Sequence, residues 1–475
     1  MLRLFPLLTA AILLSACQQA EEQNPERDFD ESSFVSSNLP LIVVQTNGVP
    51  IPDEPKVLTR MTIINQGSEN VLSDTTHLDY GYDEAHLYAG VELRGSGSQA
   101  YAKKQYSVEL WQARSGTSLY GYDIGTTKDA LKNDSVLADQ EAELLGMPAE
   151  EDWILNAPYS DKSLMRNVLA YSLAADITGR WQPKTRFTEL FFRDADGKLD
   201  YRGVYVLIEK IKRDSNRVDL NKLKKDEISG EDLTGGYLLE LTTRDRLNSG
   251  DVWIEVGDHV LAVEYPKAGD LQPEQAAYIR NYMSTFASAL YADDADDDTS
   301  GYSAYADLDS LIDFLLINEV FKNRDAFYAS TYFYKDKNKK LVAGPVWDFN
   351  LSSGNDTHLK DVDVSPSGWF YTGKWLASGL YRSPKFIAGL QQRWQELRTG
   401  VLADDAINSR IDQYSGELNQ GAASRNFEKW DILGKFIDGN QIPDSQSHAE
   451  EVEYLRRWLL RRLEWIDSHI SSLSA

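Results

Sequence analysis

Residues 318–354 constrain the fold most, because a helical pattern there is followed by two short apolar runs around a charged turn. Apolar residues at spacings of three and four predict a helix from Leu308 to Asn323. The alternating run Ser330–Tyr334, the turn at 336–338 and the run Leu341–Val346 predict a β-hairpin. This part of the chain is therefore expected to form a helix followed directly by two paired strands.

Two aspartates stand at the ends of the predicted hairpin, Asp325 before its first strand and Asp348 after its second. Because a hairpin brings its two ends together, we expect the two carboxylates to lie close in space. Such a pair suits a divalent cation that bridges phosphates, with one carboxylate as metal ligand and the other orienting a hydroxyl group. An isolated aspartate more often caps a turn, so the hairpin alone leaves both interpretations open.

Composition excludes several functional classes. The 475 residues, 42 % of them hydrophobic, can bury a large core. A formal net charge of −25 argues against nucleic acid as a partner, because phosphate binding needs a basic face. The single cysteine allows no internal disulfide and no cysteine-based zinc site. The six histidines are scattered without paired spacing, so a histidine-ligated catalytic metal is not expected.

The first twenty residues have the pattern of an export signal: Arg3 is followed by the apolar run Leu4–Leu14. The next residues, Leu14-Ser15-Ala16-Cys17, resemble a bacterial lipobox, in which Cys17 becomes the lipid-modified N-terminus. The alternatives are an ordinary cleaved signal peptide and a short buried helix. The apolar run is short for a membrane span.

The remaining chain divides at residue 38. Residues 18–38 are polar and acidic and predict a disordered tether, and residues 39–475 contain the folded domain. No other segment approaches transmembrane length. We therefore expect an extracytoplasmic protein that contacts a membrane only through its lipid anchor. Gln18 after the cysteine favours the outer membrane if the host is Gram-negative.

Secondary-structure patterns change along the domain from strands to helices. The expected strands are 42–45, 58–64, 86–93, 105–110, 187–192, 204–208, 237–241, 252–256 and 260–264. The expected helices are 163–179, 274–291, 308–323, 384–399, 404–418 and 449–471. An α+β fold is predicted, with an antiparallel, sheet-rich N-terminal half and a helical C-terminal half, which suits two lobes with a cleft between them.

Several blocks of the sequence resemble motifs of the spore coat protein H (CotH) kinase family of atypical secreted protein kinases. The blocks follow the family's order over residues 42–472. They are Leu93–Ser98, Lys103–Val108, Asp152–Ala157, Tyr159–Asn167, Tyr201–Tyr205, Glu209-Lys210, Gly235–Glu240, Asn318–Gly354 and Leu455–Ile470. The resemblance implies an atypical, two-lobed protein-kinase-like fold.

The resemblance also implies roles for the two aspartates. Asn323-Arg324-Asp325 stands at the catalytic-loop position, where the aspartate accepts the proton of a substrate hydroxyl and Asn323 assists cofactor binding. Asp348-Phe349-Asn350 stands at the metal position, with Asp348 and Asn350 as ligands of Mg²⁺ or Mn²⁺ bound with ATP. Asparagine keeps an oxygen ligand but lacks the charge of an aspartate.

The cation that contacts the nucleotide phosphates has several candidates. Lys104 follows a glycine-containing turn that Arg94 opens, and both are assigned to the nucleotide. Lys104 could equally be a solvent-facing strand lysine. Lys162 and Arg166 are alternatives, which could instead cap the adjoining helix. The chain has no Walker A motif, which argues against a P-loop fold.

Two functional classes remain open. The first is an ATP- and Mg²⁺-dependent kinase that phosphorylates Ser or Thr of a surface or envelope protein. The second is a non-catalytic, surface-anchored module for adhesion, polysaccharide contact or scaffolding, for which 25 Tyr and 11 Trp offer stacking faces. The presence of both Asp325 and Asp348 favours the kinase, because a scaffold needs neither.

Overall fold

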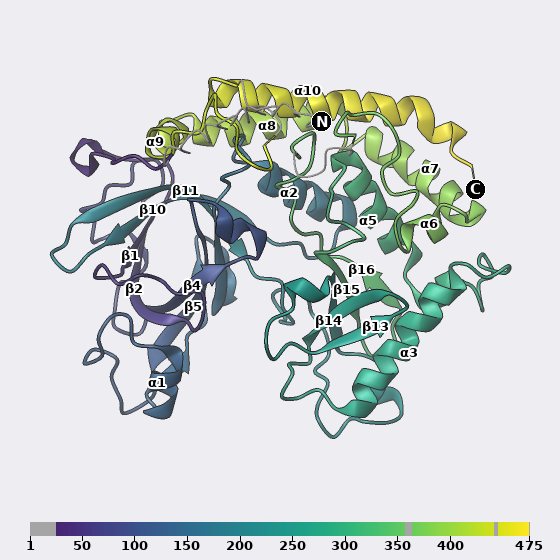
Figure 1. Cartoon of the computed structure of the whole chain (residues 1–475), viewed down its shortest axis with the longest axis horizontal. Helices are drawn as coiled ribbons and strands as arrows, with labels where there is room; N and C mark the ends of the chain where they lie inside the picture. Colours follow the sequence, from purple (N-terminus) through teal and green to yellow (C-terminus); the bar gives the residue numbers. More distant parts are fainter. Residues whose placement is uncertain (1–24, 357–362, 441–444, 475) are drawn as a thin grey trace, which may run out of the picture.

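The computed structural model describes residues 25–356, 363–440 and 445–474. The fold is mixed α and β, with most strands in the first half of the chain and most helices toward the C-terminus, as the sequence predicts. Figure 1 shows a strand-rich half in purple and blue beside a second half in teal and green, with a long yellow helix lying across both. Cys17 lies outside the described residues.

Seven strands of the first half close into a barrel. The pairing order is β1-β10-β11-β9-β5-β4-β2, and β2 pairs back to β1. The strands are β1 (Leu41–Gln45), β2 (Val57–Ile64), β4 (Tyr88–Arg94), β5 (Gln105–Ala113), β9 (Asp152–Asn156), β10 (Thr185–Arg193) and β11 (Leu199–Glu209). The β1–β10 pair is parallel, which corrects the expectation of a purely antiparallel sheet. Sequence separation hides this pairing, because no local pattern links residues 41–45 to residues 189–193.

Strand β1 is buried on both faces. Ile42 and Val44 point into the barrel core, whereas Leu41 and Val43 pack against an outer cluster that contains Phe29. The sheet is extended by β3 (Leu78–Tyr80) beside β2 and β6 (Leu137–Asp139) beside β5. A separate two-stranded sheet pairs β7 (Ala142–Leu144) with β8 (Met147–Glu150).

A second, five-stranded antiparallel sheet contains the predicted hairpin. Its order is β13-β14-β12-β15-β16. The strands are β12 (Tyr237–Thr242), β13 (Trp253–Val256), β14 (His259–Tyr265), β15 (Thr331–Lys335) and β16 (Leu341–Ala343). Phe333 pairs with Ala343 in the hairpin. The return strand ends before Pro345, which has no N–H to donate to a neighbouring strand.

Helices lie above and beside the second sheet, and α8 to α10 cover one end of the barrel, whereas α1 lies at its other end (Figure 1). They are α1 (Lys128–Asn133), α2 (Arg166–Thr178), α3 (Pro273–Ala289), α4 (Tyr302–Tyr305), α5 (Leu308–Phe321), α6 (Ala377–Leu380), α7 (Pro384–Arg398), α8 (Asp404–Leu418), α9 (Ala422–Lys429) and α10 (His448–His469). Helix α5 is buried on all sides from Ser310 to Phe321 and packs against α2, α7 and α10. No helix in the described part of the chain has the length and apolar character needed to cross a bilayer.

The segment predicted as a tether lies against the domain from residue 25 onward. Phe29 is 6 % exposed, and its ring lies 4.5 Å from that of Tyr201. Glu26 forms a β-bridge with Trp430, and the Arg27 N–H donates to the Lys429 carbonyl. Burial of the Phe29 side chain favours this packing, because it removes apolar surface from water. Residues 18–24 of the predicted tether lie outside the described residues.

A buried ion pair joins α5 to α10. The Arg462 side chain is fully buried, and its Nη2 lies 2.7 Å from Oε2 of Glu319. The same guanidinium donates to the carbonyls of Pro366 and Gly368. Glu319 in turn accepts hydrogen bonds from the N–H groups of Phe370 and Tyr371 and from the Tyr381 hydroxyl. The pair therefore fixes residues 366–371 between the two helices.

We expect Arg462→Leu to lower the free energy of unfolding by about 3–5 kcal/mol, because the Glu319 carboxylate would stay buried without its partner. Urea denaturation measures this loss. Arg461→Leu, one residue earlier on the exposed face of α10, is the matched control and should change stability by less than about 0.5 kcal/mol. Equal losses in both variants would show that the ion pair is not what stabilises the joint.

Candidate active site

The end of α5 sets the position of Asp325. Lys322 closes the helix in a left-handed conformation, with φ of 46°, and the chain then turns toward β15. The buried Nζ of Lys322 donates to the carbonyls of Asp363, Ser365 and Ser367. Burial lowers the pKa of Lys322 to about 8. This ammonium group ties the chain just before Asp325 to residues 363–367.

Asn323 connects the two aspartate-bearing loops. Its Oδ1 accepts a hydrogen bond from the N–H of Asp325, at 3.2 Å, and its Nδ2 donates to the Trp347 carbonyl, also at 3.2 Å. The second hydrogen of this amide is directed at Asn318. Asn323 is only 1 % exposed, and its side chain holds the two loops together. Its expected role in cofactor binding stays a prediction.

Asp348 has an unusual backbone conformation that α2 supports. Its φ is 62°, in the left-handed region that residues with side chains seldom adopt. Its N–H donates to the Tyr171 hydroxyl, and the next N–H, of Phe349, donates to Oδ1 of Asn167. Phe349 itself is fully buried. Surroundings that hold a carboxylate in a strained conformation are typical of functional sites.

The two aspartates interact electrostatically. Burial, followed by the negative charge of Asp325, raises the pKa of Asp348 to about 6, and Arg246 and Arg94 oppose this rise. Nη2 of Arg246 lies 3.9 Å from Oδ1 of Asp325. The two carboxylates therefore lie close together, as the hairpin predicted. Two such oxygen-rich side chains, with the amide of Asn350 two residues on, offer the hard ligands that Mg²⁺ requires.

More carboxylates lie on the neighbouring sheet. Burial and then the charge of Glu264 raise the pKa of Glu240 to about 8, while Arg94 and Arg246 oppose the rise. The side chain of Glu240 also hydrogen-bonds with Tyr332. The same two arginines thus face Glu240 and Asp348, which places the face of β12 and β15 beside the aspartate pair.

The barrel contributes positive charge to the site through its last β4 residue, Arg94. The guanidinium carbon of Arg94 lies 5.4 Å from the ring centroid of Trp347, beside Asp348. Lys104 behaves differently: its Nζ donates to the Gln99 carbonyl at 2.6 Å and so closes the turn at Gly97–Ala100. Of the two predicted phosphate ligands, Arg94 lies at the aspartates, and Lys104 stabilises its own turn.

Lys210 is a site residue that the sequence analysis overlooked. It follows the last residue of β11, and its Nζ lies 3.8 Å from Oδ1 of Asp152. Burial lowers the pKa of Lys210, Asp152 raises it, and Arg94 is one of the cations that lower it further. Lys210 is therefore within electrostatic reach of Arg94. The sequence did contain a signal for this residue: a lysine directly follows a long apolar strand and belongs to the block Glu209-Lys210, which resembles a family motif.

Lys374 is a further cation close to the loop that carries Asp325. Its Nζ donates to the Arg324 carbonyl at 2.8 Å. Burial lowers the pKa of Lys374, and the charge of Asp325 opposes this effect. A second cation thus stands next to Asp325, contributed by the segment after residue 371.

The alternative phosphate ligands, Lys162 and Arg166, have structural roles. Arg166 is fully buried, 2.5 Å from Asp161, and its Nε donates to the Ser352 carbonyl. Lys162 is also buried and donates to the Lys435 carbonyl. Both fix loops around the start of α2, which agrees with the structural alternative.

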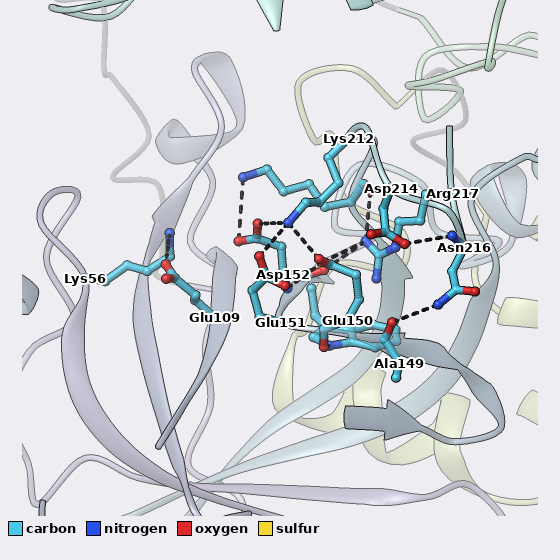
Figure 2. A network of polar contacts seen from close by, with 12 residues as sticks. Lys56, Glu109, Ala149, Glu150, Glu151, Asp152, Lys212, Asp214, Asn216 and Arg217 are labelled. Carbon is cyan, nitrogen blue, oxygen red and sulfur yellow. Dashed lines mark hydrogen bonds and ion pairs between the residues drawn. The ribbon is translucent and has the colours of Figure 1, made fainter. Parts of the chain in front are cut away.

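One group of three carboxylates, Glu150, Glu151 and Asp152, lies close enough to share a metal ion among the described residues. Figure 2 shows Lys212 directed into the middle of this group. Its Nζ lies 2.6, 2.7 and 3.0 Å from the three carboxylates in that order. The ammonium group takes the place that a metal ion would need, so this cluster is an ion-pair network beside Lys210.

We expect Mg²⁺ to protect the protein in a pH-dependent way. Because the pKa of Asp348 is raised, its proton stabilises the metal-free fold at low pH, and this contribution is lost as pH rises through about 6. Metal needs the charged carboxylate, so the Mg²⁺-induced rise in melting temperature should grow between about pH 5 and about pH 7.5. Asp348→Asn should lose this dependence, and Asp309→Asn, on the exposed start of α5, should keep it. A Mg²⁺ effect independent of pH in the unmodified protein would contradict the assignment.

Comparison with known proteins identifies the family. The profile described as CotH kinase protein matches residues 91–466, which include Arg94, Lys210, Asp325 and Asp348. A search of curated proteins gives no match. The match covers most of the chain and all parts of the site described above. The chain belongs to the CotH kinase family.

Proposed function

We propose that this protein is an atypical protein kinase that transfers the γ-phosphoryl group of ATP to a Ser or Thr hydroxyl, with Mg²⁺ or Mn²⁺. The observation that carries the proposal is the aspartate pair, which Asn323 joins and in which Asp325 raises the pKa of Asp348. Family membership supports a kinase-like function. In this proposal the barrel half and the half that contains β12–β16 are the two lobes, with nucleotide and acceptor between them.

The roles of the residues follow from their positions. Asp325 orients the acceptor hydroxyl and takes its proton, and Lys374 beside it balances the negative charge on the acceptor side. Asp348 and Asn350 hold the metal, which when bound neutralises charge on the phosphates. Arg94 and Lys210 approach the phosphates from the barrel, with Asp152 orienting Lys210.

Asn323 positions the loop of the proton acceptor Asp325 and the loop of the metal ligand Asp348 together. Its amide bonds the loop of the proton acceptor to the loop of the metal ligand, so a shift of one loop displaces the other. Phosphoryl transfer depends on such positioning, because little covalent chemistry is left for the protein. The Asn323 side chain therefore acts through the two aspartates.

Substitution of each aspartate separates binding from transfer. We expect Asp348→Asn to weaken Mg²⁺-dependent nucleotide binding and to abolish transfer together. Asp325→Asn should leave nucleotide binding nearly intact and lower turnover by about 10²–10⁴-fold, the usual loss for a general base. Thermal shift with ATP and Mg²⁺ measures binding, and γ-labelled ATP with a Ser-rich acceptor measures transfer.

Asp309→Asn, a carboxylate change on the exposed surface of α5, is the control for these variants and should alter neither quantity. Equal loss of binding in both aspartate variants would keep the site but reject this division of roles. Unmodified protein that shows neither binding nor transfer with ATP or GTP would reject the kinase and favour the non-catalytic surface module.

We further propose that the protein is anchored outside the cytoplasm through lipid on Cys17 and acts on a surface or envelope protein. The lipobox-like residues 14–17 support this location. Cys17→Ser should abolish lipid modification and move the protein from the membrane fraction to the soluble fraction. Membrane retention of that variant with an uncleaved N-terminus would show that residues 1–20 form an anchor helix instead.

A further inference from the structure

The face of α10 that carries the exposed Arg457 and Arg461 and the buried Trp458 borders a groove. Tyr454, Arg457, Trp458 and Arg461 recur at helical spacing on this face, opposite residues 363–366. Together these residues enclose about 510 Å³. This volume falls in the range of specific ligand pockets, roughly 300–1,000 Å³.

The walls of the groove are fixed to each other. Nε1 of Trp458 donates to the Val364 carbonyl at 2.8 Å, and the Tyr454 hydroxyl donates to the Gly354 carbonyl. The buried guanidinium of Arg462 donates a hydrogen bond to the Pro366 carbonyl. The groove is therefore formed before any ligand binds, which lowers the entropy cost of binding.

Two arginines at the groove form few ion pairs within the described part of the chain. Nε of Arg457 lies 3.5 Å from Glu453, and its side chain is 61 % exposed. Within the described residues, Arg461 is exposed and takes part in no ion pair. By contrast, the neighbouring Arg456 is paired with Asp412. The described lining of the groove thus carries two arginines and one carboxylate, Asp363, and is net positive in a chain with 74 acidic and 49 basic side chains.

We propose that this groove binds an acidic segment of a partner protein. Arg457 and Arg461 lie one helical turn apart and would each pair with a carboxylate of the segment, while Val364 and Pro366 contact apolar side chains between them. The overall net charge of −25 disfavours an acidic partner on the surface as a whole, so we infer that the two arginines select where it docks. The proposal does not depend on phosphoryl transfer.

A phosphate on Ser365 of the same chain is the other anion that could reach the arginines. The Ser365 hydroxyl and N–H hold the pKa of Asp363 below its usual range, so this carboxylate is charged at neutral pH. A phosphate on Ser365 would lie against that charge and would remove the hydrogen bond from the Ser365 hydroxyl. Asp363 also lines the groove, but the chain ties a phosphate on Ser365 to this neighbour, whereas the carboxylates of a separate segment are not so tied. This difference favours an anion supplied by a partner.

Binding of a labelled ten-residue peptide to the full chain, without ATP, tests the proposal. The peptide carries glutamates four residues apart with leucines between them, and fluorescence anisotropy reports its binding. We expect the affinity to fall with added salt, and to fall about tenfold or more in the double variant Arg457→Glu, Arg461→Glu. Arg280→Glu, on the exposed face of α3, is the matched control and should bind normally. The unmodified protein should not bind the same peptide with lysine in place of glutamate.

Three results would overturn the proposal: no binding by unmodified protein, equal binding by the double variant, or equal binding of the lysine peptide. Asp325→Asn should bind the acidic peptide normally, so failure of phosphoryl transfer and failure of this groove are distinguishable. After incubation with ATP and Mg²⁺, mass spectrometry that finds phosphate on Ser365, together with loss of peptide binding, would assign the groove to the modified chain and reject a partner.

Discussion

The buried ion pair between Glu319 and Arg462 is the interaction on which the site depends. It joins the last turn of α5 to α10 and holds residues 366–371 between them. Three residues after Glu319, Lys322 fixes a further part of the same segment, and Asn323 follows directly. A buried ion pair adds little net stability compared with apolar packing, but it permits few alternative arrangements. In this protein the pair fixes the end of α5, residues 366–371 and α10 relative to one another.

The site combines side chains that are far apart in the sequence. Asp325 and Asp348 come from the two ends of the β15–β16 hairpin, whereas Arg94 and Lys210 come from strand ends of the barrel. The two groups meet where the Arg94 guanidinium lies 5.4 Å from the ring of Trp347, beside Asp348, and the charge of Arg94 opposes the rise in the pKa of Asp348. Negative charge from one half and positive charge from the other suit a ligand that contains both metal and phosphate.

Local patterns predicted local structure well. The helix expected at Leu308–Asn323 and the hairpin after it appear within two or three residues of their expected ends, and the closeness of the two aspartates followed from the hairpin. Contacts between distant segments could not be predicted. The parallel β1–β10 pair and the bridge made by Asn323 depend on tertiary packing, which leaves no periodic signal. Lys104 and Lys210 illustrate the same limit, since each simply flanks a strand and only the fold distinguishes them.

Closure of the barrel sets where the folded unit begins. The family match starts at residue 91, yet β1 and β2, which complete the ring between β10 and β4, lie before it. A fragment cut at residue 91 would divide β4 and would leave one edge of β10 and one edge of the rest of β4 unpaired, and such open strand edges pair readily with other chains. The boundary of sequence similarity and the boundary of independent folding are therefore different in this protein, and soluble fragments need to begin before Leu41.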